Sequence, residues 1–184
     1  GDGFPKEHQG NNSQQGIAFL KVSDMNLKEN SQGMVAAKNY IPQDLNNNRI
    51  KPHVFDVGTL IFPKVGKAID TNKKNILRVK ASIDNNLMGI SSKDKNTLLP
   101  AYLLLYFKHY IQLIELASTA NPPSISAAAL KDLKIPLPPK ETQEKIVAEI
   151  SDLECKEEKA IAQISSLKAS IMDHISCFES RNKE

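Results

Sequence analysis

The last quarter of the chain, residues 138–178, carries the pattern that most constrains the fold. It begins at a group of three prolines, at positions 136, 138 and 139, and no glycine or proline follows them to the end of the chain. Mostly apolar residues then recur at alternating steps of four and three, the 3.5-residue period of a coiled-coil seam. Eight of these ten positions are apolar: Ile146, Ile150, Leu153, Glu157, Ala160, Ile164, Leu167, Ile171, His174 and Phe178.

One long helix is therefore predicted over about residues 142–178. At 1.5 Å per residue it would be roughly 55 Å long, which is more than a small domain can cover. Its seam therefore needs a partner, and Glu157 and His174, which interrupt the seam, are where we expect register to be controlled. The predicted helix interface consists of Ile146, Ile150, Leu153, Ile164, Leu167, Ile171 and Phe178.

The sequence before this helix is long enough for one ordinary domain. Of 184 residues, 40% are hydrophobic, and no run of 18 apolar residues predicts a membrane span. The polar start of the chain lacks Met and predicts no signal peptide. Cys155 and Cys177 lie in the same predicted helix, too far apart along its axis to pair, so a reducing cytoplasm is the expected compartment.

Charge is divided unevenly along the chain. Residues 140–184 carry seven Lys/Arg against ten Asp/Glu, which leaves 17 basic and 11 acidic residues before Lys140. A basic domain followed by an acidic helix favours a polyanion partner for the domain and a protein partner for the helix. A basic excess of this size is also common in proteins that bind no nucleic acid.

The middle of the chain predicts strands joined by basic turns. Short apolar runs predict strands at residues 17–22, 54–62, 76–83 and 86–90, with a break at residues 56–58 and a further sheet entry at residues 68–69. The period then changes to helical over residues 100–117, with Pro100 suited to a first turn. A short helix over residues 127–133, capped by Ser124 or Ser126, follows. We predict an α+β fold: a mixed, mostly antiparallel β domain over residues 1–137, then a long C-terminal coiled-coil helix over residues 138–184.

Sequence motifs for catalysis are weak. Residues 121–124, Asn-Pro-Pro-Ser, are similar to the Asn-Pro-Pro-aromatic element of adenine-N6 methyltransferases, but Ser124 stands where the stacking ring would be. No glycine-rich loop follows a strand to hold a nucleotide cofactor. A helix breaker before a capping serine explains this segment better, and a methyltransferase fragment remains an alternative. No metal site is predicted, because the four histidines are scattered: His8, His53, His109 and His174.

A basic cluster gives the clearest functional signal. Lysines in turns can neutralise phosphates, and Asn and Arg side chains can read base edges. A solvated charged face would show the same pattern. Between residues 64 and 80 one acid, Asp70, accompanies six cations: Lys64, Lys67, Lys73, Lys74, Arg78 and Lys80.

Several segments, in order, resemble a target-recognition domain in the specificity subunit of type I restriction–modification systems. The closing segment contains Ile-Pro-Leu-Pro-Pro followed by a long helix, and Thr142 stands inside the Glu-Gln pair that the family typically shows. The matching segments are residues 16–26 (GIAFLKVSDMN), 58–69 (GTLIFPKVGKAI), 71–74 (TNKK), 84–90 (DNNLMGI) and 124–146 (from SIS to ETQEKI).

This resemblance implies a DNA-recognition role without catalysis. Residues 1–137 would be the target-recognition domain and residues 138–184 the conserved spacer helix, docking surface and dimerisation element. A complete subunit usually carries two of each, with antiparallel helices, and each domain reads one half of a bipartite site; this chain resembles half of one. Two domains held about 55 Å apart would lie at most about 16 base pairs apart.

The resemblance also implies partners. They are double-stranded DNA, the modification (methyltransferase) and restriction subunits, and a second copy or a second half of the specificity subunit through the long helix, all in a prokaryotic cytoplasm. S-adenosylmethionine, ATP and magnesium are expected only on the partner subunits. A coiled-coil adaptor that binds only protein remains an alternative. The residues predicted to face DNA are Lys64, Lys67, Asn72, Lys73 and Lys74, together with Lys21 and Asn26.

Overall fold

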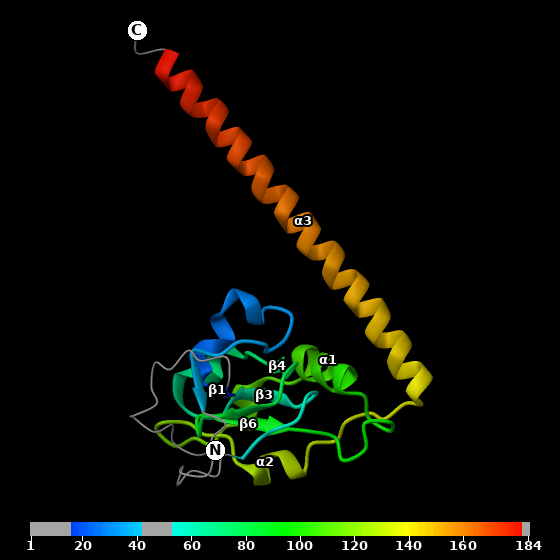
Figure 1. The fold of residues 1–184 in the computed structure, drawn as a ribbon. Helices are drawn as coiled ribbons and strands as arrows, with labels where there is room; N and C mark the ends of the chain where they lie inside the picture. Colours follow the sequence, from blue (N-terminus) through cyan, green and yellow to red (C-terminus); the bar gives the residue numbers. More distant parts are fainter. Residues whose placement is uncertain (1–15, 42–52, 182–184) are drawn as a thin grey trace. The chain divides into compact units, whose positions relative to one another are not determined.

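A computed structural model describes residues 16–41 and 53–181, with side chains to residue 175. The chain divides into two compact units, Gly1–Lys140 and Glu141–Glu184. The first, called the globular unit below, holds two small sheets, and Figure 1 shows its strands together with helices α1 and α2.

One sheet is built around the first strand of the described chain, β1 (Ile17–Leu20). It has the order β2-β1-β5, in which β2 spans Asn39–Ile41 and β5 spans Ala81–Ile83. β1 pairs antiparallel with β2 and parallel with β5. A first core of buried apolar side chains packs on this sheet, including Leu20, Met34 and Ile83.

The second sheet is antiparallel and is built around β3 (Leu60–Pro63). β4 (Asn75–Ile76) and β6 (Leu87–Ile90) flank it. All four β3 residues are buried, because successive side chains point to opposite faces and both faces are covered. Ile61 packs in the first core, whereas Leu60 and Phe62 pack in a second core with residues of α1. The predicted mixed, mostly antiparallel α+β fold is confirmed.

Helix α1 (Pro100–Tyr110) covers the second core. Pro100 occupies its first turn, as predicted, and the ring of Phe107 stacks on Phe62 with centroids 5.8 Å apart. The predicted continuation to residue 117 is wrong: the helix ends at Tyr110, and a 3₁₀ helix, η5 (Leu113–Leu116), follows. The Ile111 carbonyl and the Leu113 amide instead bond to side chains from another segment.

Other local predictions are confirmed or corrected by backbone contacts. α2 (Ala127–Lys131) is confirmed, and its cap is Ser126, whose Oγ accepts from the Ala129 amide at 3.2 Å. The sheet entry at residues 68–69 is wrong, because Gly66–Thr71 form a 3₁₀ helix, η4, that buries Ile69 in the second core. The strand predicted at residues 76–83 is divided into β4 and β5. The break predicted at residues 56–58 is confirmed: Phe55 before it forms an isolated bridge to Ala81, Gly58 turns the chain at φ +88°, and β3 begins at Leu60.

The long C-terminal helix is confirmed as α3 (Lys140–Arg181), with 42 residues. Its length is about 63 Å at 1.5 Å per residue. Ile146 and Ile150 are partly exposed, and the side chain of Phe178 lies outside the described residues. No helix of the described residues is long and apolar enough to cross a membrane. Large apolar side chains along α3 are exposed: Leu153, Ile161, Ile164, Leu167, Ile171, Met172 and Ile175.

Candidate nucleic-acid interface

The basic turn that follows η4 is held by its first residue, Asn72. This residue adopts a left-handed backbone conformation with φ 53°, which asparagine tolerates better than most residues. The Asn72 side-chain Oδ1 accepts from the Leu113 amide at 2.9 Å and from the Lys74 ammonium at 2.7 Å. The side chain of Asn72 therefore links the turn to the segment after α1.

Lys74 strengthens the same link. Its Nζ donates to the Ile111 carbonyl at 2.6 Å, and the residue is only 8% exposed. Desolvation by burial lowers the pKa of Lys74 to about 8. The ammonium group points into the protein, so the prediction that Lys74 faces DNA does not fit its place in the fold. Asn72 likewise uses its side-chain oxygen internally.

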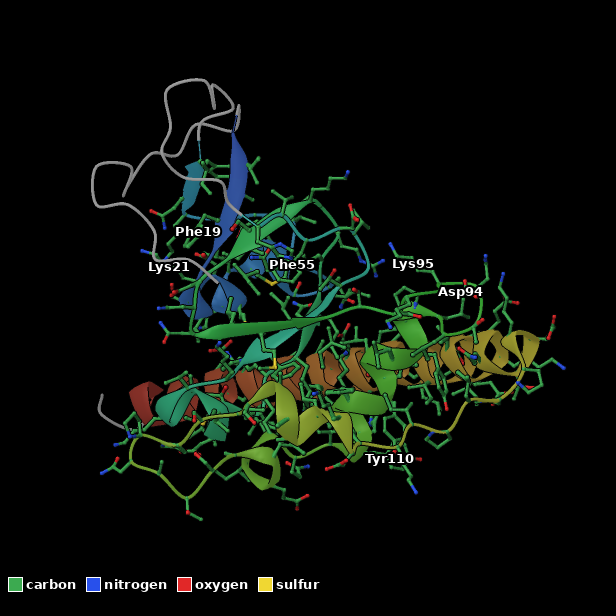
Figure 2. The ribbon with its side chains drawn as sticks, turned by 90° about the horizontal axis from the view of Figure 1, so that it is seen from below. Phe19, Lys21, Phe55, Asp94, Lys95 and Tyr110 are labelled. Atoms are coloured by element: carbon green, nitrogen blue, oxygen red, sulfur yellow. The ribbon has the colours of Figure 1, made fainter. Side chains whose placement is uncertain are left out.

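Lys73 lies between these two anchored residues and is exposed. Its Nζ donates to Oδ1 of Asn26, an exposed residue at the end of the 3₁₀ helix η2 (Val22–Asn26). The fold therefore brings together two predicted site residues that lie 47 positions apart in the chain. Lys21 directly precedes η2 and is partly exposed; Figure 2 shows it on the opposite side of the globular unit from Asp94 and Lys95.

The remaining two predicted lysines lie on the approach to the turn. Lys64, directly after β3, is partly exposed; its amide donates to the Asn86 carbonyl at 2.9 Å. Lys67 is exposed in the first turn of η4. From the rest of the basic cluster, Lys80 forms an exposed ion pair with Asp56 at 3.3 Å. Of the predicted cations, Lys67 and Lys73 are thus exposed, and Lys64 and Lys21 are partly exposed.

A buried asparagine supports this surface and was missed by sequence reasoning. Asn30 is fully buried, and its side-chain amide bonds to the backbone of Asp24, Val35 and Ala36. Its own carbonyl accepts from the Asn75 side chain at 2.6 Å, directly after the basic turn. Asn30 therefore fixes the segment that carries Asn26 relative to β4. Nothing in a Lys-Glu-Asn tripeptide distinguishes this role from that of a solvated loop residue.

The surface has the chemistry of a nucleic-acid contact. Exposed lysines can pair with phosphates, and an exposed asparagine amide can donate to and accept from a base edge. Within the described parts of the chain, no group of three or more His, Cys, Asp or Glu side chains is placed to hold a metal ion.

The buried Lys74 predicts a particular pH dependence of stability. Its folded pKa is about 8, whereas its ordinary value is 10.5. Between these values the unfolded chain binds more protons, so this group makes the free energy of unfolding rise with pH. We expect the wild type to gain about 1–3 kcal/mol from pH 8 to pH 10 relative to Lys74→Met. Urea unfolding at the two pH values measures this, and parallel profiles for the two proteins would contradict it.

Comparison with known proteins identifies one family and solved structures of similar fold. The family described as "Type I restriction modification DNA specificity domain" matches residues 11–166. One similar structure comes from work on complex assembly and conformational transition of the type I R-M system. Its sequence is 21% identical to this chain, and the two superpose with a TM-score of 0.62. The HsdS subunit from Thermoanaerobacter tengcongensis shares 19% identity at a TM-score of 0.58.

Both structural matches cover 84% of this chain. They cover 35% and 34% of the other chains, so this chain spans about a third of the length of these proteins. At these identities the similarity is one of fold. No curated protein sequence matches the chain.

Proposed function

Because the chain belongs to the type I restriction–modification DNA specificity domain family, we propose that it recognises a double-stranded DNA sequence as one half of a specificity subunit. The observation that carries this proposal is the anchored basic turn. Asn72 and Lys74 bond inward to the segment after α1, and Lys73 between them remains exposed beside Asn26. A rigid turn of this kind can present a cation to a phosphate at little cost in side-chain ordering.

The two parts of the chain would have different roles in DNA recognition. Residues 1–137 would supply the DNA contacts, and residues 138–184 would act as the spacer helix. A second copy, or a second half of a longer subunit, would supply the other recognition domain. The modification and restriction subunits would carry out adenine methylation and cleavage, with S-adenosylmethionine, ATP and magnesium bound on those partners in a prokaryotic cytoplasm.

Duplex binding across a salt titration tests the proposal. A fluorescently labelled random duplex should bind at low salt, and the logarithm of its affinity should fall linearly with the logarithm of salt concentration. A coiled-coil adaptor that binds only protein would give no change in anisotropy. A methyltransferase fragment would instead give heat on titration with S-adenosylmethionine, which we do not expect.

The proposed pairing through α3 rests on its apolar surface. Ile164, Leu167 and Ile171 occupy consecutive seam positions and are each more than half exposed. Ile161, Met172 and Ile175 lie beside the 3.5-residue seam and widen it toward the C-terminal part of the helix. Exposed apolar rows of this extent are typical of interfaces. A second α3 helix, in antiparallel orientation, would bury them.

A seam charge should disrupt this pairing. Leu167→Glu would place an unpaired carboxylate in the apolar contact, and we expect self-association to weaken by about 100-fold or more. Ala169→Glu, two residues away and outside the seam, is the matched control and should associate like the wild type. Light scattering over a concentration series measures both. A wild type that remains monomeric at every concentration would contradict the proposed pairing.

A further inference from the structure

A short loop after α1 lies against the basic segment that follows β3. This loop, residues 118–124, closes on itself through its two end residues. The Ser118 amide donates to the Ser124 carbonyl at 2.8 Å, and the Ser124 amide donates to Ser118 Oγ at 3.3 Å. The two hydroxyl groups also lie 3.3 Å apart. Because its ends are bonded together, the loop forms a defined projection from the globular unit.

Backbone bonds attach the base of the loop to the segment that carries Lys64 and Lys67. The Ile125 amide donates to the Lys64 carbonyl, and the Gly66 amide donates to the Pro123 carbonyl, both at 2.8 Å. Between them, Val65 and Ser124 form an antiparallel bridge. The closed loop and these two lysines are therefore parts of one surface, although they lie more than 50 residues apart in the chain.

The tip of the loop is polar and uncharged. Residues 118–122, Ser-Thr-Ala-Asn-Pro, are all exposed. The nearest acidic residues along the chain are Glu115 and Asp132. At the base of the loop, an added Cβ at Gly66 would meet nothing within 4 Å. A phosphate backbone approaching this surface would therefore meet no acidic side chain in the loop.

The combination of residues suits a DNA groove. Lysines neutralise phosphates and position the protein, whereas asparagine can make two hydrogen bonds to one base edge. Asn121 is exposed, and its side chain has no hydrogen-bond partner among the described residues. Proline at positions 122 and 123 restricts the backbone directly after Asn121, which reduces the ordering required on binding.

We propose that the closed loop is a base-reading element, in which Asn121 hydrogen-bonds to a base edge while Lys64 and Lys67 contact the flanking phosphates. This inference rests on the proposed DNA recognition and assigns sequence discrimination to a specific residue. It separates two kinds of contact on one surface: the lysines supply affinity for any duplex, and Asn121 supplies preference at one position of the site. It also gives a function to the Asn-Pro-Pro-Ser segment that does not require methyl transfer.

Selection from a random duplex library tests the assignment on the full chain. The wild type, Asn121→Ala and the control Asn96→Ala are each carried through selection, and the enriched sequences are compared. Asn96 is also exposed and follows Lys95, on the side of the globular unit away from Lys21 in Figure 2. We expect Asn121→Ala to lose roughly 10- to 100-fold discrimination at one or two base pairs while keeping the rest of the motif. Asn96→Ala should enrich the wild-type motif.

Two further measurements keep the outcomes distinct. Affinity for unselected duplex and its salt dependence should be unchanged in Asn121→Ala, because no cation is lost. The same motif with the same discrimination in both proteins would overturn the base-reading role. Weakened binding to unselected duplex, with an unchanged unfolding midpoint, would also overturn it by making Asn121 a phosphate contact. A wild type that enriches no motif would instead refute the proposed function itself.

Discussion

Replacing Asn30 by alanine is expected to lower the free energy of unfolding by about 3 kcal/mol. Its Nδ2 donates to the Asp24 and Ala36 carbonyls, both at 2.8 Å. Its Oδ1 accepts from the Val35 and Ala36 amides at 2.8 and 2.9 Å. Truncation removes all four bonds and leaves these backbone groups without their partner. Because Val35 is exposed, water can reach part of the vacated site, which limits the loss.

Urea unfolding monitored by circular dichroism measures this loss. Asn96→Ala is the matched control, since Asn96 is exposed, and its unfolding free energy should lie within about 0.5 kcal/mol of the wild type. Asn30→Asp is the sharper variant, because it keeps the Oδ1 acceptor but replaces Nδ2, the donor to two carbonyls, with a second oxygen. If Asn30→Ala were as stable as the control, the fold of residues 24–36 would not depend on this side chain.

Charge reversal at the exposed lysines should produce the largest loss of DNA affinity. Lys67→Glu and Lys73→Glu are each expected to weaken duplex binding about tenfold at low salt, and the double variant about 100-fold. Each lost phosphate contact should also reduce the salt slope by about one. Lys74 is unsuitable for this test because its buried ammonium supports the turn, so its replacement would confound stability with binding.

Lys93→Glu is the control for these variants. Lys93 is exposed and precedes Asp94, which Figure 2 shows on the opposite side of the globular unit from Lys21. Lys93→Glu changes the net charge of the protein by the same amount as Lys73→Glu, but at a different place on the surface. Anisotropy titrations at several salt concentrations compare the variants. Equal losses in Lys93→Glu and Lys73→Glu would mean that only total charge matters and that the turn is not the contact surface.

Features with a local cause were predicted well from the sequence. Residues within a few positions of one another determine three such features: the period of α3, the first-turn proline of α1 and the serine cap of α2. The strand predicted over residues 17–22 is likewise found as β1, which ends at Leu20 because the 3₁₀ helix η2 begins at Val22. The resemblance of the matching segments to the specificity-domain family is likewise confirmed, because the family matches residues 11–166.

Features that depend on distant partners were missed. The inward direction of Asn72 and Lys74 is set by Leu113 and Ile111, which lie 41 and 37 residues away. Those same bonds are made directly after α1, which ends at Tyr110 rather than at the predicted position. A run of Asn-Lys-Lys therefore predicts a basic turn but cannot show which lysine is exposed. The role of Asn30 is hidden for the same reason, since its importance comes from burial.

The most direct test of DNA sequence recognition is a ratio of two affinities. The duplex enriched by the wild-type chain and a scrambled duplex of the same composition are titrated at the same physiological salt concentration. Discrimination at a few base pairs, each about 1–3 kcal/mol, predicts that the enriched duplex binds at least about 100-fold more tightly. Equal affinities for the two duplexes would contradict the account, because binding would then depend on the phosphate backbone alone.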